Sequence, residues 1–104
     1  MRLNKQYDEV INRIVDAVNP LQILLFGSAA RQEDGVESDV DLLVVMPEGT
    51  HCRKTAQYLH SLLFGIPYPV DILVATPSLL EKHKNNIGLI YHEILQEGQE
   101  LYAA

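Results

Sequence analysis

The sequence has 104 residues, of which 47% are hydrophobic and 21% charged, and this composition predicts one soluble globular domain over residues 1–104. Eight Lys and Arg residues against fourteen Asp and Glu residues give a net charge of −6 without a long basic run, which argues against direct binding of nucleic acid. A single cysteine excludes an internal disulfide, and no apolar run reaches the about 18 to 20 residues of a membrane span, so we expect a cytoplasmic protein.

The first half of the chain predicts one helix and two strands. Apolar residues recur at three- and four-residue steps from Asn4 to Val18, as in an amphipathic helix, and the Asn19-Pro20 pair ends it. The apolar run Gln22 to Phe26 predicts a buried strand that breaks at Gly27. The run from Val40 to Met46 is almost wholly apolar, which indicates a central strand covered on both faces.

The second half continues the alternation of helices and strands. In chain order it predicts a helix over His51 to Phe64, a strand over Val70 to Ala75, a helix that starts at Thr76-Pro77 and breaks at Asn85-Asn86, and a last helix over about Ile87 to Glu97. Gly98 stands where a glycine often ends a helix. The alternation predicts an α/β layer fold.

Two aspartates stand two positions apart at the start of the central strand. Side chains two apart on a strand share a face, with α-carbons about 6.6 Å apart, so Asp39 and Asp41 could hold one or two hard cations between them. Asp71 lies at the start of the third strand. If the two strands are neighbours, Asp71 completes a three-carboxylate site, the protein half of metal-assisted phosphoryl chemistry.

A candidate phosphate-binding element precedes these carboxylates. Gly27 lets the backbone turn sharply at the strand end, and Ser28 would present its hydroxyl and nearby backbone N–H groups to an anion at the start of a short helix over Ser28 to Gln32. Arg31, one turn later, could add charge to a polyphosphate or could instead pair with a neighbouring acid.

The motif LLFGSAAR…SDVDLLVV followed by VDILV resembles the catalytic signature of the nucleotidyltransferase superfamily that includes DNA polymerase beta. More narrowly, the chain looks like the minimal nucleotidyltransferases, and its ending IYHEILQEGQELY is similar to the close of such proteins. The resemblance covers nearly the whole chain. It implies an α/β (α+β) fold of two layers, with a small mixed sheet packed with helices.

The resemblance also implies roles for the motif residues. Asp39 and Asp41 would ligate two metal ions, normally Mg²⁺, and Asp71 would ligate the metal on the acceptor side and orient or deprotonate the attacking hydroxyl. Gly27 and Ser28 would hold the β- and γ-phosphates of a nucleoside triphosphate, for which ATP is the usual donor.

One position departs from the family pattern. The family often has glycine directly after the arginine, whereas Gln32 follows Arg31 here and Gly35 stands three residues further on. This departure leaves the nucleotide preference open more than it affects metal binding.

The resemblance implies in-line attack of an acceptor hydroxyl on the α-phosphorus, with loss of pyrophosphate. Minimal nucleotidyltransferases are typically paired with an all-helical HEPN-family toxin, and some transfer AMP to a toxin tyrosine, so an antitoxin role is the leading expectation. Two alternatives stay open, a free-standing transferase that acts on another protein or a small molecule and a catalytically silent module that neutralises its partner by contact. Self-association is also left open.

Other readings of the acidic and ligand-type residues are weaker. Phosphatases of the haloacid dehalogenase type and glycosyltransferases place their aspartates after a strand, whereas here an apolar strand follows them. A zinc site at His51, Cys52 and His60 would lack a fourth ligand and the usual spacing. The remaining acids of the loop are expected to be solvated charges: Glu33, Asp34 and Glu37.

Overall fold

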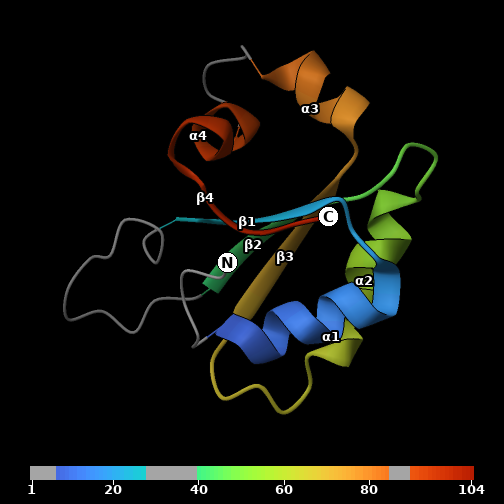
Figure 1. Cartoon of the computed structure of the whole chain (residues 1–104), viewed down its shortest axis with the longest axis vertical. Coiled ribbons are helices and arrows are strands. Elements are labelled where there is room, and N and C mark those ends of the chain that lie inside the picture. The colour runs from blue at the N-terminus through green and yellow to red at the C-terminus, as the bar shows by residue number, and fades with distance from the viewer. Residues whose placement is uncertain (1–6, 28–39, 85–89) are drawn as a thin grey trace.

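The computed structural model describes residues 7–27, 40–84 and 90–104, and the strands of these residues form one sheet with helices on both faces (Figure 1). The elements in chain order are α1 (Asp8–Val18), β1 (Gln22–Phe26), β2 (Val40–Val45), α2 (Cys52–Leu62), β3 (Val70–Ala75), α3 (Pro77–His83), α4 (Ile90–Glu97) and β4 (Gln99–Ala103). The strand order is β3-β2-β1-β4, with β2 parallel to β3 and β1 antiparallel to β2 and β4. A small mixed sheet packed with helices was the predicted fold class, and it is confirmed.

Helix α1 follows from the apolar spacing of the sequence. Val10, Ile11 and Ile14 are buried on one side of the helix, which is the side that the three- and four-residue steps define. The helix ends where Asn19 takes a left-handed conformation (φ 48°) and donates its N–H to the carbonyl of Val15 (3.0 Å). The predicted start at Asn4 lies outside the described residues.

Three of the strands were predicted from the sequence, and a fourth was not. β1 and β3 have the predicted bounds, and β2 ends one residue before Met46. The last helix ends at Glu97 as expected, and the N–H of Gly98 donates to the carbonyl of Ile94 (2.7 Å). The chain then continues as the edge strand β4, which the sequence analysis did not predict.

The other helices lie close to their predicted ranges. α2 is shorter than predicted, because the chain turns from Leu63 onward. His51 caps its start, since the Nδ1 atom of His51 accepts a hydrogen bond from the N–H of Lys54 (3.2 Å). α3 starts at Pro77 as predicted, and the predicted break at Asn85-Asn86 lies outside the described residues.

Alternate residues of β2 belong to two apolar clusters on opposite faces of the sheet. Val40, Leu42 and Val44 pack with α1 and α2, whereas Leu43 and Val45 pack with α3 and α4. The central-strand prediction for β2 is therefore confirmed. The α1/α2 side forms the expected two layers, and α3 and α4 add a partial third layer (Figure 1).

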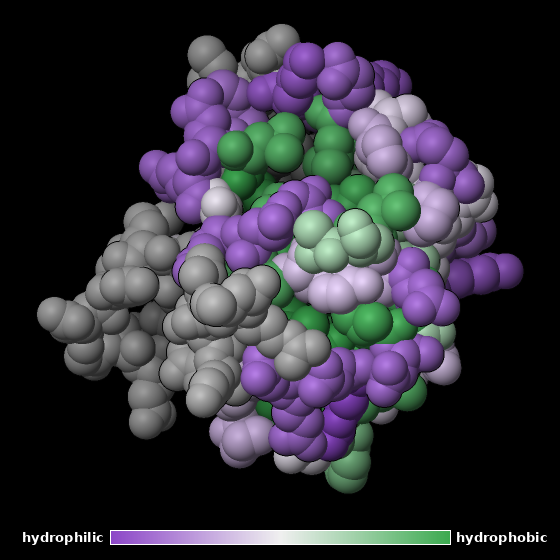
Figure 2. Space-filling model, viewed as in Figure 1, coloured by the Kyte–Doolittle hydropathy of each residue, from purple (hydrophilic) through white to green (hydrophobic). Residues whose placement is uncertain are grey.

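Polar and apolar side chains are unevenly distributed on the surface. On the face shown in Figure 2, hydrophilic side chains surround apolar ones that lie over the sheet, between α3 and α4 above and α1 and α2 below. None of the helices in the described ranges is long and apolar enough to cross a bilayer.

Arg13 joins α1 to the end of α2. Its Nη1 atom donates to the carbonyls of Leu62 (3.1 Å) and Phe64 (2.9 Å), and its Nη2 atom pairs with the carboxylate of Glu9 (2.8 Å). Carbonyls at a helix C-terminus carry partial negative charge and lack partners within the helix. The guanidinium therefore satisfies one such carbonyl, that of Leu62, and also binds the carbonyl of Phe64 in the turn that follows α2.

We expect Arg13→Met to lower the free energy of unfolding by about 1 kcal/mol, the net value of a partly exposed charged hydrogen-bond group. Urea denaturation followed by circular dichroism measures the change. Arg53→Met is the matched control, because Arg53 is exposed on α2 and should tolerate the same change. Equal stabilities of the two variants would show that Arg13 does not hold the two helices together.

Glu48 caps α3 in place of the expected Thr76. The Oε1 atom of Glu48 accepts from the N–H of Ser78 (2.7 Å), and its Oε2 atom accepts from the Ser78 hydroxyl (2.6 Å). Thr76 occupies the N-cap position without a capping hydrogen bond from its side chain. The hydrogen bonds from the hydroxyl and then the N–H of Ser78 lower the pKa of the Glu48 carboxyl from its ordinary value of 4.5.

This lowered pKa predicts a pH dependence of stability. Because the folded pKa lies below the unfolded one, Glu48 stabilises the fold above a pH of about 4.5 and loses this contribution as the pH falls through the folded pKa. We expect Glu48→Gln to unfold at lower temperature than the wild type near pH 7, with a difference that shrinks in acid. A thermal difference independent of pH would contradict the capping role of the charge.

Candidate functional site

Two of the predicted aspartates lie side by side on one face of the sheet. Asp41 on β2 and Asp71 on β3 are register partners in the parallel ladder, and neighbouring strands lie about 4.8 Å apart. Both side chains lie on the α3/α4 face, since they share the alternation of Leu43 and Leu73. Asp41 is half-buried and Asp71 exposed. The condition that the two strands be neighbours is thus met.

The register that pairs these carboxylates is fixed at the start of both strands. The N–H of Val40 donates to the carbonyl of Pro69 (2.9 Å), directly before the two aspartates. Leu42 and Ile72, one residue after them, are buried among the α1/α2 cluster. A slip by one residue would turn a carboxylate into that cluster, where its desolvation would be unfavourable.

Gly27 brings the main chain against Asp41. It follows β1 with a φ of +76°, a conformation that L side chains rarely adopt, and Phe26 before it is the register partner of Asp41. A Cβ atom on Gly27 would collide with the Oδ2 atom of Asp41. Glycine at this position therefore permits both the turn and the close approach of backbone to carboxylate.

The donor set fits a hard divalent cation. Asp41 and Asp71 supply carboxylate oxygens from adjacent strands, and such oxygens are the ligands that Mg²⁺ prefers. Two ionised carboxylates on directly paired residues of neighbouring strands repel each other, and a bound cation relieves this repulsion. In the described ranges no group of three or more His, Cys, Asp or Glu side chains gathers as a metal site, and the third predicted ligand, Asp39, lies outside those ranges.

The structure places half of the predicted site residues. Gly27, Asp41 and Asp71 come together as described. The remaining predicted residues and the acidic loop lie outside the described part of the chain: Ser28, Arg31, Gln32, Glu33, Asp34, Glu37 and Asp39.

The zinc hypothesis for the start of α2 finds no support in the geometry. His51 uses its Nδ1 atom to cap the helix, and the thiol of Cys52 donates to the carbonyl of Thr50 (3.8 Å). His60 lies in the last turn of the same helix. These residues do not converge on a common point.

Tyr68 is a packing residue that lies close to Asp71 in the sequence. It precedes β3 and contacts Tyr7 edge-on, with ring centroids 6.3 Å apart and an interplanar angle of 81°. Burial raises the pKa of the Tyr68 hydroxyl, which keeps it protonated. Tyr7 and Tyr68 pack on the α1/α2 cluster, on the face of the sheet opposite the carboxylates.

Phe26 is a neighbour of the candidate site that the sequence pattern did not predict. As the partner of Asp41 across the antiparallel ladder, it continues the row formed by Asp41 and Asp71 on the same face. The half-buried ring of Phe26 packs on the α3/α4 cluster and gives the carboxylates an apolar border. The alternation of side chains along β1 indicates which face Phe26 occupies. Its position beside Asp41 follows only when the register between β1 and β2 is known.

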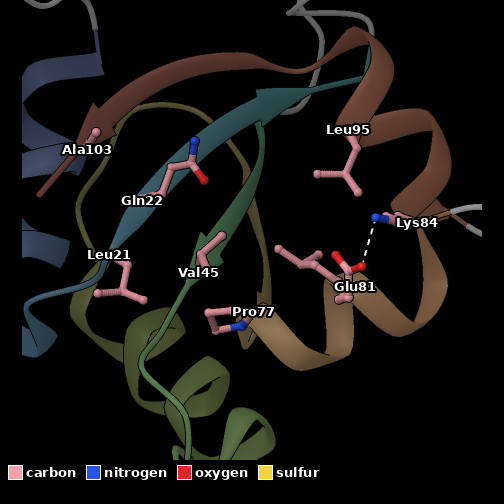
Figure 3. A pocket seen from close by; sticks show the side chains of 9 residues that line it. Leu21, Gln22, Val45, Pro77, Glu81, Lys84, Leu95 and Ala103 are labelled. Atoms are coloured by element: carbon pink, nitrogen blue, oxygen red, sulfur yellow. Dashed lines mark ion pairs between the residues drawn. The ribbon is translucent and has the colours of Figure 1, made fainter.

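A pocket of about 430 Å³ lies at the opposite end of the same face (Figure 3). Val45, Pro77 and Leu95 line it, and the ion pair between Glu81 and Lys84 (2.8 Å) lies at its side. Val45 is four residues from Asp41, which is about 13 Å along a strand. The pocket is therefore separate from the carboxylate pair.

Solved structures show the same fold. A toxin–antitoxin structure with AMP-PNP matches with a TM-score of 0.68 and 20% identity, over 97% of this chain and 75% of that chain. A protein from Sulfolobus solfataricus, solved as a candidate nucleotidyltransferase, matches with a TM-score of 0.63 and 19% identity over 95% and 78%. The toxin–antitoxin MntA–HepT matches with a TM-score of 0.62 and 20% identity over 95% and 71%.

A comparison with curated proteins returns no significant match. The family model described as polymerase beta, nucleotidyltransferase matches residues 8–104, which include Gly27, Asp41 and Asp71. Because this family model matches almost the whole length of the chain, the chain belongs to the polymerase beta nucleotidyltransferase family.

Proposed function

We propose that this chain transfers a nucleoside monophosphate, AMP in the first instance, from a nucleoside triphosphate to an acceptor hydroxyl. The observation that carries the proposal is the register pairing of Asp41 with Asp71 beside Gly27. A pair of carboxylates, one of which lies against a glycine turn, suits metal-assisted phosphoryl transfer.

In this mechanism Asp41, together with Asp39, would hold Mg²⁺, and the bound ion would supply positive charge for the triphosphate and the leaving pyrophosphate. Gly27 and Ser28 bind the β- and γ-phosphates through backbone N–H groups and the hydroxyl, and Arg31 adds positive charge. Asp71 orients the acceptor hydroxyl and accepts its proton. The acceptor oxygen forms a bond to the α-phosphorus, the bond from that phosphorus to the bridging oxygen breaks, and pyrophosphate leaves.

The proposed acceptor is a tyrosine of a partner toxin, which makes the chain an antitoxin. Support comes from the folds of solved toxin–antitoxin structures, one of which is described with AMP-PNP. An all-helical HEPN-type chain is the partner that we propose. The net charge of −6 fits a protein acceptor better than a nucleic acid.

Label transfer tests the activity. The purified chain, Mg²⁺ and the toxin are incubated with ATP labelled at the α-phosphate or, as a control, at the γ-phosphate. Label that enters the toxin only from the α-position establishes transfer of the nucleotidyl group. Toxin inhibition without any label would support neutralisation by contact instead, and label on a small molecule would support a free-standing transferase.

Replacing the aspartates one at a time separates binding from transfer. We expect Asp41→Asn to abolish Mg²⁺-dependent nucleotide binding, because a ligand carboxylate is lost. Asp71→Asn should retain nucleotide binding and lower the transfer rate by about 100-fold or more, the usual value of a general base. Asp16→Asn on the exposed side of α1 is the matched control. A wild-type transfer rate in Asp71→Asn would remove this residue from the mechanism.

Gly27→Ala tests the contact between the glycine turn and Asp41. We expect it to abolish transfer, because the new methyl group would displace the Asp41 carboxylate. Gly49→Ala is the matched control, because Gly49 also has a positive φ (+89°) but has open space where a Cβ would lie. Both variants should lose about 1 kcal/mol of stability from backbone strain, and only Gly27→Ala should lose activity. Equal activities would refute the contact.

A further inference from the structure

The segment from Gly49 to Val70 contains none of the fourteen acidic residues of the chain, although the net charge is −6. It forms α2 and the turn after it, and it carries Arg53, Lys54 and His60, all exposed. Within the described ranges neither Arg53 nor Lys54 forms an ion pair. The outer side of α2 is therefore a basic surface on an acidic protein.

Two aromatic side chains lie exposed on the same segment. The side chain of Phe64 is 89% exposed and that of Tyr58 is 50% exposed, and the other large exposed hydrophobic residues of the described chain, Leu21 and Leu95, border the pocket on the opposite face. We define the α2 surface as Arg53, Lys54, Tyr58, His60 and Phe64. Aromatic residues amid positive charge are typical of the centre of a protein interface.

The backbone that carries Phe64 is held in place. Arg13 donates to the carbonyl of Phe64 (2.9 Å), and the N–H of Ile66 donates to the carbonyl of Leu63 (3.2 Å). Gly65, with a φ of +90°, allows the sharp turn, and the side chain of Leu63 is buried in the α1/α2 cluster. Phe64 is thus presented to solvent on an ordered turn, and little entropy is lost when it binds.

We propose that the α2 surface docks a partner protein whose own surface is acidic around an apolar pocket that receives Phe64. Charge complementarity supports this occupant, because Arg53 and Lys54 have no acidic partner in the described part of the chain. A symmetric pair of identical chains would place Arg53 and Lys54 against positive charge. Nucleic acid fits less well, because two arginine or lysine side chains are few against the six to ten phosphate contacts, roughly, of typical binders.

The identity of the partner rests on the proposed function, under which it is the toxin. The docking surface lies on the α1/α2 face, and the carboxylates lie on the α3/α4 face. Variants of the docking surface should therefore leave nucleotide binding at the carboxylates unchanged. This separation allows docking and nucleotide binding to be tested independently.

The test measures the affinity of the full chain for the purified toxin by titration calorimetry. We expect Phe64→Ser to weaken binding by about 30-fold or more, the effect of losing a central aromatic anchor. Leu95→Ser is the matched control, because Leu95 is also an exposed large hydrophobic side chain (43%) but lies on α4. Unchanged affinity in Phe64→Ser would overturn the proposal.

The double variant Arg53→Glu, Lys54→Glu tests the charge. We expect binding to weaken by about tenfold or more at low salt and less at high salt. Both positions lie in the first turn of α2, where acidic residues stabilise a helix, so unfolding would not account for the loss. Lys82→Glu on α3 is the control, because it reverses one positive charge at a position outside the α2 surface.

The outcomes separate docking from catalysis. Phe64→Ser should keep Mg²⁺-dependent nucleotide binding, and Asp71→Asn should bind the toxin as tightly as the wild type. A wild-type chain that binds no toxin would overturn the docking proposal and the antitoxin role, while nucleotide binding through Asp41 would still stand or fall in its own assay. Variants that change self-association in sedimentation but not toxin affinity would assign the surface to a second copy and overturn the proposal.

Discussion

The parallel register between β2 and β3 is the constraint on which the candidate site depends. The pairing of Asp41 with Asp71 is a consequence of the apolar residues that follow them, because Leu42 and Ile72 must face the α1/α2 cluster. The hydrogen bond from Val40 to the carbonyl of Pro69 then closes the ladder at its first residues. Burial of apolar side chains thus fixes the position of charged ones, at the end of the sheet where they remain accessible.

Repulsion between the paired carboxylates opposes this arrangement. Asp41 is half-buried against Gly27, while Asp71 is exposed at the edge strand β3. The two side chains therefore have different access to solvent and to an acceptor. In the proposed mechanism this asymmetry suits their roles, since the inner carboxylate stays with the nucleotide and the outer one meets the incoming hydroxyl.

Local patterns in the sequence predict most of the fold, and pairing between distant segments limits the rest. The apolar runs of β1 and β3 have clear ends at Gly27, Pro69 and Pro77, so their bounds could be read directly. The bounds of β4 could not be predicted, because Leu101 is its only buried side chain and the strand depends on pairing with β1. The cap of α3 by Glu48 escaped prediction for the same reason, since the two elements are thirty residues apart.

The site itself shows the same limit. The sequence predicts which aspartates matter, and only the register shows that Phe26 borders them and that Gly27 contacts Asp41. The spacing of Asp39 and Asp41 follows from strand geometry alone. Their distance from Asp71 depends on a parallel connection through α2, which no local pattern specifies.

The connection through α2 also relates docking to transfer. Phe64 and Asp71 are seven residues apart, so the turn after α2 lies within about 25 Å of the carboxylate at the start of β3. In Figure 1 the chain runs from the end of α2 to the end of the sheet at which β3 begins. β3 is an edge strand, and nothing in the described chain pairs with its outer side. A partner bound at Phe64 would therefore need only a short extension around this edge to bring a hydroxyl to Asp71. One bound partner can thus reach both the docking surface and the carboxylates, although these lie on opposite faces of the sheet.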